Sequence, residues 1–287
     1  MTTLKFKQVD VFTSRPFYGN PVAVVFDADG VSDEQMLKIA NWTNLSETTF
    51  FQSPSPGSGA DYKLRIFHPQ GELAFAGHPT VGSAHAWLEH TGKQPETLRM
   101  ECGAGVLTIR PEGEGSETLI FSETPQAQFV HEFGTSVEAI SAALGASVAA
   151  DPPPASTYNG PTWLFVQVDD AALTALTPDL AAVERLSRDF SLTGIAAFAL
   201  REGETAVHIR CFAPVAGVRE DPVTGSANGA LPTYLARTGL LGRVGREYVS
   251  TQGTELGRDG RVHVRTDGVR TQIGGQSITL IEGEIRL

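Results

Sequence analysis

The pattern of apolar and polar residues along the chain predicts a mixture of short strands and amphipathic helices. Alternating apolar positions at 62–67 and 206–212 are typical of half-buried strands. The apolar run at 22–26 predicts a buried strand, and similar segments predict strands at 106–110 and 163–168. Strands of this kind, separated by helices, indicate the α+β class.

Helices are predicted between these strands. One begins with the capping-box sequence at 32–35, and another covers 178–190. A short helix at 135–144 ends at Gly145, a residue type that tolerates the left-handed conformation of a helix end. Two apolar segments within 278–287 predict a closing hairpin.

One sequence pattern occurs twice in the chain. Each copy has an R-x-F-x-P segment followed by a P-x-x-G-S-A segment, in the same order and at nearly the same spacing. The first copy comprises residues 65–69 and 79–84, and the second comprises 210–214 and 222–227. A repeat this long predicts two similar halves that face each other across a pseudo-twofold axis. We expect these halves at 1–128 and 129–287.

Each half places small residues at a predicted helix start, namely 77–80 in the first and 224–227 in the second. A helix start presents unpaired backbone N–H groups and a partial positive charge, and glycine lets a ligand approach the backbone closely. Two such starts at one cleft would bind a carboxylate or an enolate-like oxygen. The alternative is a pair of tight turns that bind nothing. Pro232 is expected to kink or shorten the second helix.

Three side chains are candidates for proton chemistry. In the repeat His78 aligns with Asp221, so an imidazole that changes charge near neutral pH matches a carboxylate, and across a shared cleft the two would form a proton-handling pair. Glu47 precedes the aromatic pair Phe50 and Phe51, where partial desolvation would raise its pKa and suit acid–base work. The alternatives are a buried structural histidine and a solvated glutamate.

Composition narrows the function classes. The chain has 287 residues, with 22 Lys and Arg against 33 Asp and Glu, and a net charge of −11. This balance argues against a nucleic-acid clamp or a polybasic membrane binder. With 41% hydrophobic and 19% charged residues the chain is neither disordered nor fibrous. No signal peptide and no stretch of about 18 apolar residues is visible, so a cytoplasmic protein without a membrane partner is expected.

The two cysteines, Cys102 and Cys211, are too few for a disulfide scaffold or a four-thiolate zinc site. The turn at Cys102 resembles that of a two-thiol racemase, but the strand pattern at 106–110 follows it in place of a helix. We therefore predict that both thiols are structural and buried. The 7 histidines are scattered, and we predict no metal.

Five segments together resemble the phenazine-biosynthesis PhzF family. They are residues 19–21, 45–50, 65–67, 75–82 and 220–227, and they extend over nearly the whole chain in family order. The resemblance implies the diaminopimelate-epimerase-like fold. In that fold two pseudo-symmetric α/β halves each wrap a β-sheet or barrel around a central helix, and the active site lies in the cleft between the halves. The last strand can return to the first half.

The resemblance also implies a cofactor-free isomerase that shifts a proton on a small carboxylic acid related to dihydro-hydroxyanthranilate, and a homodimer. Glu47 would take the proton from one carbon and return it to another. The implied catalytic residues are Glu47, His78 and Asp221, and the implied substrate-binding residues are Ser46, Gly77, Thr80, Gly225 and Ser226.

Two other functions stay open at this point. In epimerase relatives both helix starts carry reactive cysteines, whereas this chain has Gly77-His78 and Gly225-Ser226 there, which disfavours a thiol racemase. The first alternative is a cysteine-independent epimerase or racemase of an amino-acid-like substrate. The second is a carboxylate-binding protein without turnover.

Overall fold

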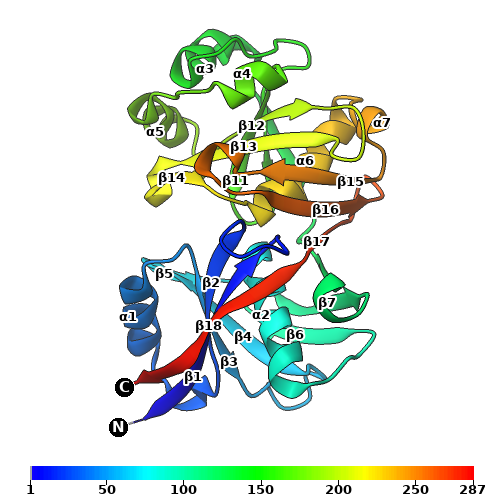
Figure 1. Cartoon of the computed structure of the whole chain (residues 1–287). Helices are drawn as coiled ribbons and strands as arrows, with labels where there is room; N and C mark the ends of the chain where they lie inside the picture. Colours follow the sequence, from blue (N-terminus) through cyan, green and yellow to red (C-terminus); the bar gives the residue numbers. More distant parts are fainter. Residues whose placement is uncertain (1) are drawn as a thin grey trace. The chain divides into compact units, whose positions relative to one another are not determined.

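The computed structural model describes residues 2–287, which form two compact units (Figure 1). Unit 1 comprises Met1–Glu123 and Gly274–Leu287, and unit 2 comprises Thr124–Ile273. The sequence suggested a change of unit between 128 and 129, whereas the chain enters unit 2 after Glu123 and leaves it after Ile273.

Unit 1 contains a sheet and two α-helices. The strands are β1 (Thr3–Val11), β2 (Asn20–Val25), β3 (Thr48–Gln52), β4 (Tyr62–His68), β5 (Gly71–Leu73), β6 (Leu98–Cys102), β7 (Gly105–Glu112), β8 (Leu119–Glu123) and β18 (Ser277–Arg286). The helices are α1 (Asp33–Thr43) and α2 (Gly77–Thr91).

Unit 2 has a similar sheet and more helices. The strands are β9 (Gln128–Glu132), β10 (Ala155–Tyr158), β11 (Thr162–Gln167), β12 (Gly194–Leu200), β13 (Val207–Ala213), β14 (Val218–Asp221), β15 (Glu247–Gln252), β16 (Gly260–Thr266) and β17 (Thr271–Gly275), the last of which ends in unit 1. The helices are α3 (Val137–Leu144), α4 (Asp170–Thr174), α5 (Leu180–Asp189), α6 (Gly225–Arg237) and α7 (Leu241–Val244). No helix within residues 2–287 combines the length and apolarity needed to cross a bilayer.

The two units pair their strands in the same way. In unit 1, β1–β2 is antiparallel, β2–β3 parallel, β3–β4 antiparallel, β4–β6 parallel and β6–β7 antiparallel. In unit 2 the same series of directions joins β10, β11, β12, β13, β15 and β16. A central helix, α2 or α6, follows the short strand β5 or β14. The sequence repeat is therefore confirmed as two copies of one topology.

The first strand of each series, β1 or β10, has a further antiparallel partner on its other edge. β18 pairs antiparallel with β1, from Thr3 opposite Arg286 to Val11 opposite Ser277. β9 takes the same place beside β10. The predicted hairpin within 278–287 is wrong, because these residues form one continuous strand. β1 offers a full-length antiparallel partner, and Gly283 therefore stays extended opposite Phe6.

Each sheet packs against its central helix on one face. The first turns of α2 are buried, and a Cβ at Gly82 would lie 2.6 Å from the side chains of Val11 and Val22, so only glycine permits this approach. In unit 2 the ring of Tyr234 on α6 contacts Phe165 and Phe198 at centroid distances of 5.9 and 5.6 Å. Pro232 does not end α6, which runs through it to Arg237.

Other helices cover the opposite face of each sheet. Side chains alternate along β11, so that Phe165 contacts α6 while Leu164 and Val166 join the core formed with α3, α4 and α5. In unit 1 Phe67 of β4 packs with the apolar residues of α1. The predicted capping box is present at the start of α1, where Ser32 and Gln35 exchange hydrogen bonds of 3.1 and 3.3 Å.

The arginine of the repeated R-x-F-x-P segment has the same structural role in both units. Arg65 on β4 binds both carboxylate oxygens of Glu72, with two bonds of 2.8 and 2.6 Å. Arg210 on β13 binds both oxygens of Glu220 at 2.8 Å. Each guanidinium also lies 5.2 Å from the centre of the phenylalanine ring two residues on. The arginine of the motif therefore links β4 to β5 in unit 1 and β13 to β14 in unit 2.

The two arginines differ in burial and in their further partners. Arg65 reaches Asp33 at the start of α1, and its partners Glu72 and Asp33 are 43% and 82% exposed. The side chain of Arg210 is 6% exposed and that of Glu220 is 12% exposed. Nη1 of Arg210 donates to the carbonyl oxygens of Leu173 and Leu176 at 2.9 and 3.1 Å, which attaches the end of α4 to the sheet.

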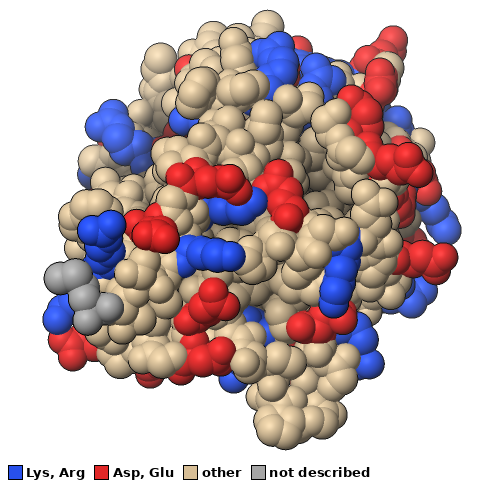
Figure 2. Space-filling view, turned by 60° about the horizontal axis from the view of Figure 1, so that its bottom comes forward, with Lys and Arg blue, Asp and Glu red and all other residues tan. Residues whose placement is uncertain are grey.

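Charges of both signs share the molecular surface. On the face drawn in Figure 2, Lys and Arg lie among Asp and Glu. One exposed pair joins Lys38 and Glu34 on α1, whose atoms are 2.7 Å apart. A more buried group holds β18 in place. Nζ of Lys7 on β1 lies 2.7 Å from Glu89 of α2 and 2.6 Å from Glu282 of β18.

Arg210→Gln is expected to lower the free energy of unfolding by about 3–5 kcal/mol, because it leaves a buried carboxylate and two buried carbonyl groups without their donor. Arg65→Gln is the matched control, with an expected loss of about 1 kcal/mol or less because its partners are open to water. Urea denaturation followed by circular dichroism measures both values. Equal losses at the two positions would contradict the difference in burial.

Glu89 makes unit 1 sensitive to acid. Burial by itself raises the pKa of Glu89, but hydrogen bonds from His85, Lys7 and Thr279 outweigh it and lower the pKa from 4.5 to about 2. A carboxylate with a lowered folded-state pKa stabilises the protein above its unfolded-state pKa, and this contribution is lost as the pH falls to the folded-state value.

The wild-type protein is therefore expected to be more stable than Glu89→Gln above pH 4.5, and the difference should disappear as the pH falls from 4.5 towards about 2. Urea denaturation at a series of pH values measures this difference. Glu34→Gln, which removes a solvent-screened pair on α1, should change stability far less. A difference for Glu89→Gln that is constant across this pH range would rule out the assigned role.

Candidate functional site

The carboxylate of Glu47 lies against the imidazole of His78 in unit 1. Oε2 of Glu47 is 3.1 Å from Nδ1 of His78, and the two side chains are 18% and 6% exposed. The two atoms lie at ion-pair distance, but Oε2 of Glu47 has no hydrogen-bond partner among the described residues, so the contact lacks the alignment of a hydrogen bond. Water is largely excluded from the pair, so its electrostatic interaction is stronger than that of a surface pair.

Backbone contacts of β2 and β3 hold Glu47 in place. Glu47 precedes β3, and its carbonyl oxygen accepts a hydrogen bond of 3.3 Å from the N–H of Ala23 on β2. One residue into β3, the hydroxyl groups of Thr49 and Ser83 of α2 are 2.8 Å apart. Strand β3, which directly follows Glu47, is thus bonded to α2, which carries His78.

The first turn of α2 is buried and has no side-chain cap. Gly77 and His78 are its first two residues, and Ala76 at the N-cap position offers no capping side chain. Pro79 has no N–H group, and the hydroxyl of Thr80 donates to the carbonyl oxygen of Ala76 at 2.8 Å. The first N–H groups of a helix have no partner within the helix, so this turn can hold an anionic oxygen beside Glu47.

The predicted residues of unit 2 surround the start of α6. Asp221 ends β14, and its Oδ2 accepts a hydrogen bond of 2.7 Å from the hydroxyl of Thr224. Gly225 and Ser226 are the first residues of α6, which also has no side-chain cap. Oγ of Ser226 accepts a 3.0 Å bond from the indole N–H of Trp163, which fixes the hydroxyl at the helix start.

The sequence alignment of His78 with Asp221 is wrong. Gly77 begins α2 and Gly225 begins α6, so His78 corresponds to Ser226, the second residue of the other helix. The aligned motif paired Gly77 with Glu220, which lies within β14. Three residues join the short strand to the helix in both units, but the arginine and the glutamate of the preceding strand pair are 7 residues apart in unit 1 and 10 in unit 2, so the P-x-x-G-S-A similarity is out of structural register.

The structure therefore brings together Glu47, His78, Gly77 and Thr80 in unit 1, with Ser46 next to Glu47 in the chain. It brings together Asp221, Gly225 and Ser226 in unit 2. Joint action of the two groups on one ligand stays a prediction, as do the individual roles in catalysis and binding.

Both thiols are buried and free, as predicted. Burial raises the pKa of Cys102 and of Cys211, and the negative charges of Asp221 and Glu220 raise the pKa of Cys211 further. Neither thiol is at the start of α2 or α6. Catalysis by a thiolate base at either helix start is therefore disfavoured.

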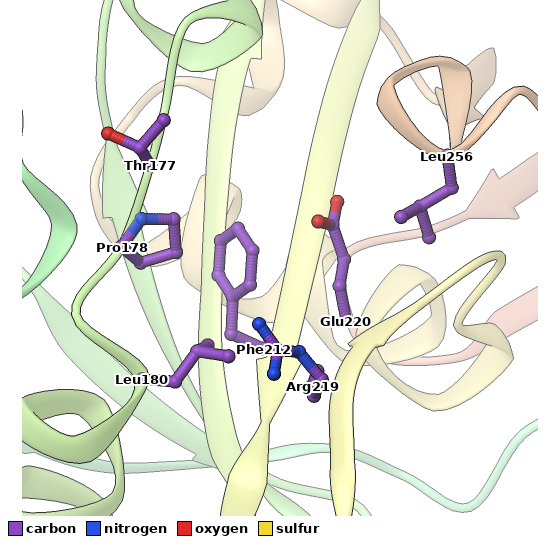
Figure 3. Close-up of a pocket in the computed structure, with 7 residues that line it drawn as sticks. All are labelled: Thr177, Pro178, Leu180, Phe212, Arg219, Glu220 and Leu256. Atoms are coloured by element: carbon purple, nitrogen blue, oxygen red, sulfur yellow. The ribbon is translucent and has the colours of Figure 1, made fainter.

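Other parts of the chain offer less for chemistry. Among residues 2–287, no three His, Cys, Asp or Glu side chains are grouped so as to hold a metal ion. A cavity of about 560 Å³ in unit 2 is lined by apolar side chains and by Thr177, Arg219 and Glu220 (Figure 3). It contains none of the predicted site residues, and its carboxylate is already bound by Arg210.

Trp163, Thr224 and Gln252 contact the predicted residues of unit 2. The sequence placed Thr224 at a helix start and predicted no functional role for any of the three. Strand β15 ends at Gln252, which is followed by Gly253, and the equivalent strand β6 of the other unit ends at Cys102, which is followed by Gly103. The equivalence follows from the parallel pairs β13–β15 and β4–β6. Comparing the two halves at this position is the signal that would have drawn attention to Gln252.

Comparisons with known proteins find relatives that match nearly the whole chain. A family profile described as "Phenazine biosynthesis-like protein" matches residues 9–283. The chain is 36% identical to antisense-enhancing sequence 1 of Schizosaccharomyces pombe, over 99% of both chains. It is also 36% identical to trans-2,3-dihydro-3-hydroxyanthranilate isomerase of Pseudomonas chlororaphis, over 97% of this chain and 98% of the relative.

The fold has a close counterpart among solved structures. The phenazine biosynthesis protein of the PhzF family from Bacillus anthracis superposes with a TM-score of 0.86 at 28% identity, over 100% of both chains. This match confirms the fold expected from the sequence. The chain therefore belongs to the PhzF-like family of isomerases and epimerases.

Proposed function

We propose that this protein shifts a proton between two carbons of a small carboxylic acid, with Glu47 as the acid–base group. The observation that carries the proposal is the 3.1 Å contact between Glu47 and His78 beside the uncapped start of α2. In this proposal Glu47 moves the proton, His78 stabilises the carboxyl group of Glu47, and the start of α2 binds an anion. No cofactor is needed for this chemistry.

The proposed step begins with the carboxylate form of Glu47. Glu47 removes a proton from a carbon next to an unsaturated carboxylate, and the electron pair moves into the conjugated system. N–H groups at the helix start stabilise the negative charge that grows on the carboxylate oxygens. Glu47 then returns the proton to another carbon. A single carboxyl group suffices when the proton leaves and returns on the same face of the ring.

His78 supports both protonation states of Glu47. When Glu47 is ionised, Nδ1–H of His78 is proposed to donate to Oε2, and when the substrate proton is held on Oε1, Nδ1–H goes on donating to the same Oε2. The histidine thereby keeps the carboxyl group in one orientation between proton removal and proton return. Asp221 and Ser226 in unit 2, and Ser46 beside Glu47 in unit 1, are proposed to bind polar groups of substrate.

The proposed substrate class is a cyclic carboxylic acid similar to trans-2,3-dihydro-3-hydroxyanthranilate. Support comes from the substrate in the name of the Pseudomonas chlororaphis relative, which is 36% identical across nearly the whole chain. The helix start of α2 fits the carboxylate of such a compound, and Glu47 fits a weakly acidic ring carbon. The homodimer and the cytoplasmic location expected from the sequence stay predictions.

Glu47→Gln is expected to reduce turnover of trans-2,3-dihydro-3-hydroxyanthranilate by about 10²–10⁴-fold, because the amide cannot accept a proton from carbon. The melting temperature should change little, since Gln keeps the shape and a polar contact with His78. Proton NMR of the substrate follows the reaction. Glu34→Gln, at an exposed position on α1, should retain full turnover, and a folded, fully active Glu47→Gln variant would remove Glu47 from the mechanism.

Isomerisation and epimerisation differ in where solvent deuterium appears. In ²H₂O the proposed isomerase should place deuterium at the carbon that receives the proton, and the double bonds of the product should be shifted. An epimerase of an amino-acid-like acid would instead exchange the proton at one stereocentre and leave the bonding unchanged. Carbon and proton NMR of the product distinguish the two, and exchange without a bond shift would favour the epimerase.

A further inference from the structure

Gln252 is the centre of a buried polar network in front of α6. Its Nε2 donates to the carbonyl oxygen of Asp221 and to the hydroxyl oxygen of Thr224, both at 2.8 Å. Its Oε1 accepts from the backbone N–H of Thr224 at 2.9 Å and from Nδ2 of Asn228 at 3.3 Å. Gln252 is 1% exposed, so both ends of its amide group are fixed by protein partners.

These contacts determine the direction of the Thr224 hydroxyl. Its oxygen accepts from Gln252, and its single proton points to Oδ2 of Asp221, 2.7 Å away. The reverse order is excluded, because an amide Nε2 cannot accept and a carboxylate cannot donate. Asp221 therefore receives a hydrogen bond that Gln252 orients through Thr224.

Two glycines let the turn at 221–224 lie close to this network. A Cβ at Gly253, where φ is +92°, would lie 2.5 Å from the carbonyl oxygen of Pro222. A Cβ at Gly260 would lie 2.3 Å from the side chain of Val223. The turn is thus packed against β15 and β16 on both sides of Gln252, which limits the movement of Asp221.

From this network we infer that Gln252 and Thr224 are positioning residues that hold the carboxylate of Asp221 in one orientation for the reaction. The inference rests on the proposed role of Asp221. Gln252 and Thr224 are 1% and 4% exposed, so they act through Asp221 and not by contact with substrate. Their hydrogen bonds replace water that would otherwise solvate the carboxylate in several orientations.

The test compares three variants of the full-length protein. Thr224→Val removes the proton donor to Asp221 and keeps the shape, whereas Thr224→Ser keeps the donor. Gln252→Glu keeps the acceptor for the Thr224 N–H but loses the donor. The new carboxylate would accept the Thr224 proton and withdraw it from Asp221. Thr157→Val is the matched control, because it removes a buried hydroxyl that has no hydrogen-bond partner within the described structure.

Two measurements are made on each variant. The first is the turnover of trans-2,3-dihydro-3-hydroxyanthranilate, where Thr224→Val and Gln252→Glu should lower kcat on the order of 10-fold, the effect of one lost charge-assisted hydrogen bond. Thr224→Ser should recover most of the loss, and Thr157→Val should show none. The second is the carbon-13 resonance of the Asp221 carboxyl group, assigned with Asp221→Asn, which should move in the same two variants only.

The two measurements separate the inference from the proposed function. An unchanged Asp221 resonance in folded Thr224→Val would overturn the inference, as would equal losses in Thr224→Val and Thr157→Val. If the resonance moves as expected but the wild-type protein does not convert the probe, the positioning of Asp221 stands and the proposed substrate fails. If the probe is converted and Thr224→Val keeps its full kcat, the inference fails and the proposed function stands.

Discussion

The burial of a helix start against a sheet is the constraint on which unit 1 depends. Because α2 lies on the sheet at the distance that only Gly82 allows, its first turn is shielded from water. No side chain caps that turn, and the nearest ionisable groups are His78 within it and Glu47 before β3. Backbone packing thus creates both the place for an anion and the low-dielectric surroundings in which a carboxyl–imidazole pair is effective.

The two units show how one topology supports different polar chemistry. Both place an uncapped helix after a short strand, and both keep an arginine that ties the strand before it to its neighbours. Around these shared features the side chains have diverged. The second helix residue is His78 in one unit and Ser226 in the other, and Gln252 takes the place of Cys102 at the end of the equivalent strand. The scaffold is repeated, whereas the chemistry is not.

Local signals predicted much of this structure, and contacts across long sequence distances explain what they missed. The capping box of α1, the strand after Cys102 and the duplicated topology all follow from short-range patterns. The hairpin prediction failed because the partner of 277–286 is β1, at the other end of the chain. Gln252 was missed because its partners Asp221 and Thr224 meet it only through the parallel pairing of β13 with β15.

The pairing of β18 with β1 has a consequence for folding during protein synthesis. Unit 2 is a continuous segment that is translated between the two parts of unit 1. Unit 1 is begun first, yet the strand that covers β1 is translated after all of unit 2. The nascent chain therefore carries an unprotected sheet edge while unit 2 is synthesised, a site for chaperone binding or for pairing with another nascent chain, and the unit that holds Glu47 and His78 is completed only after β18 has emerged.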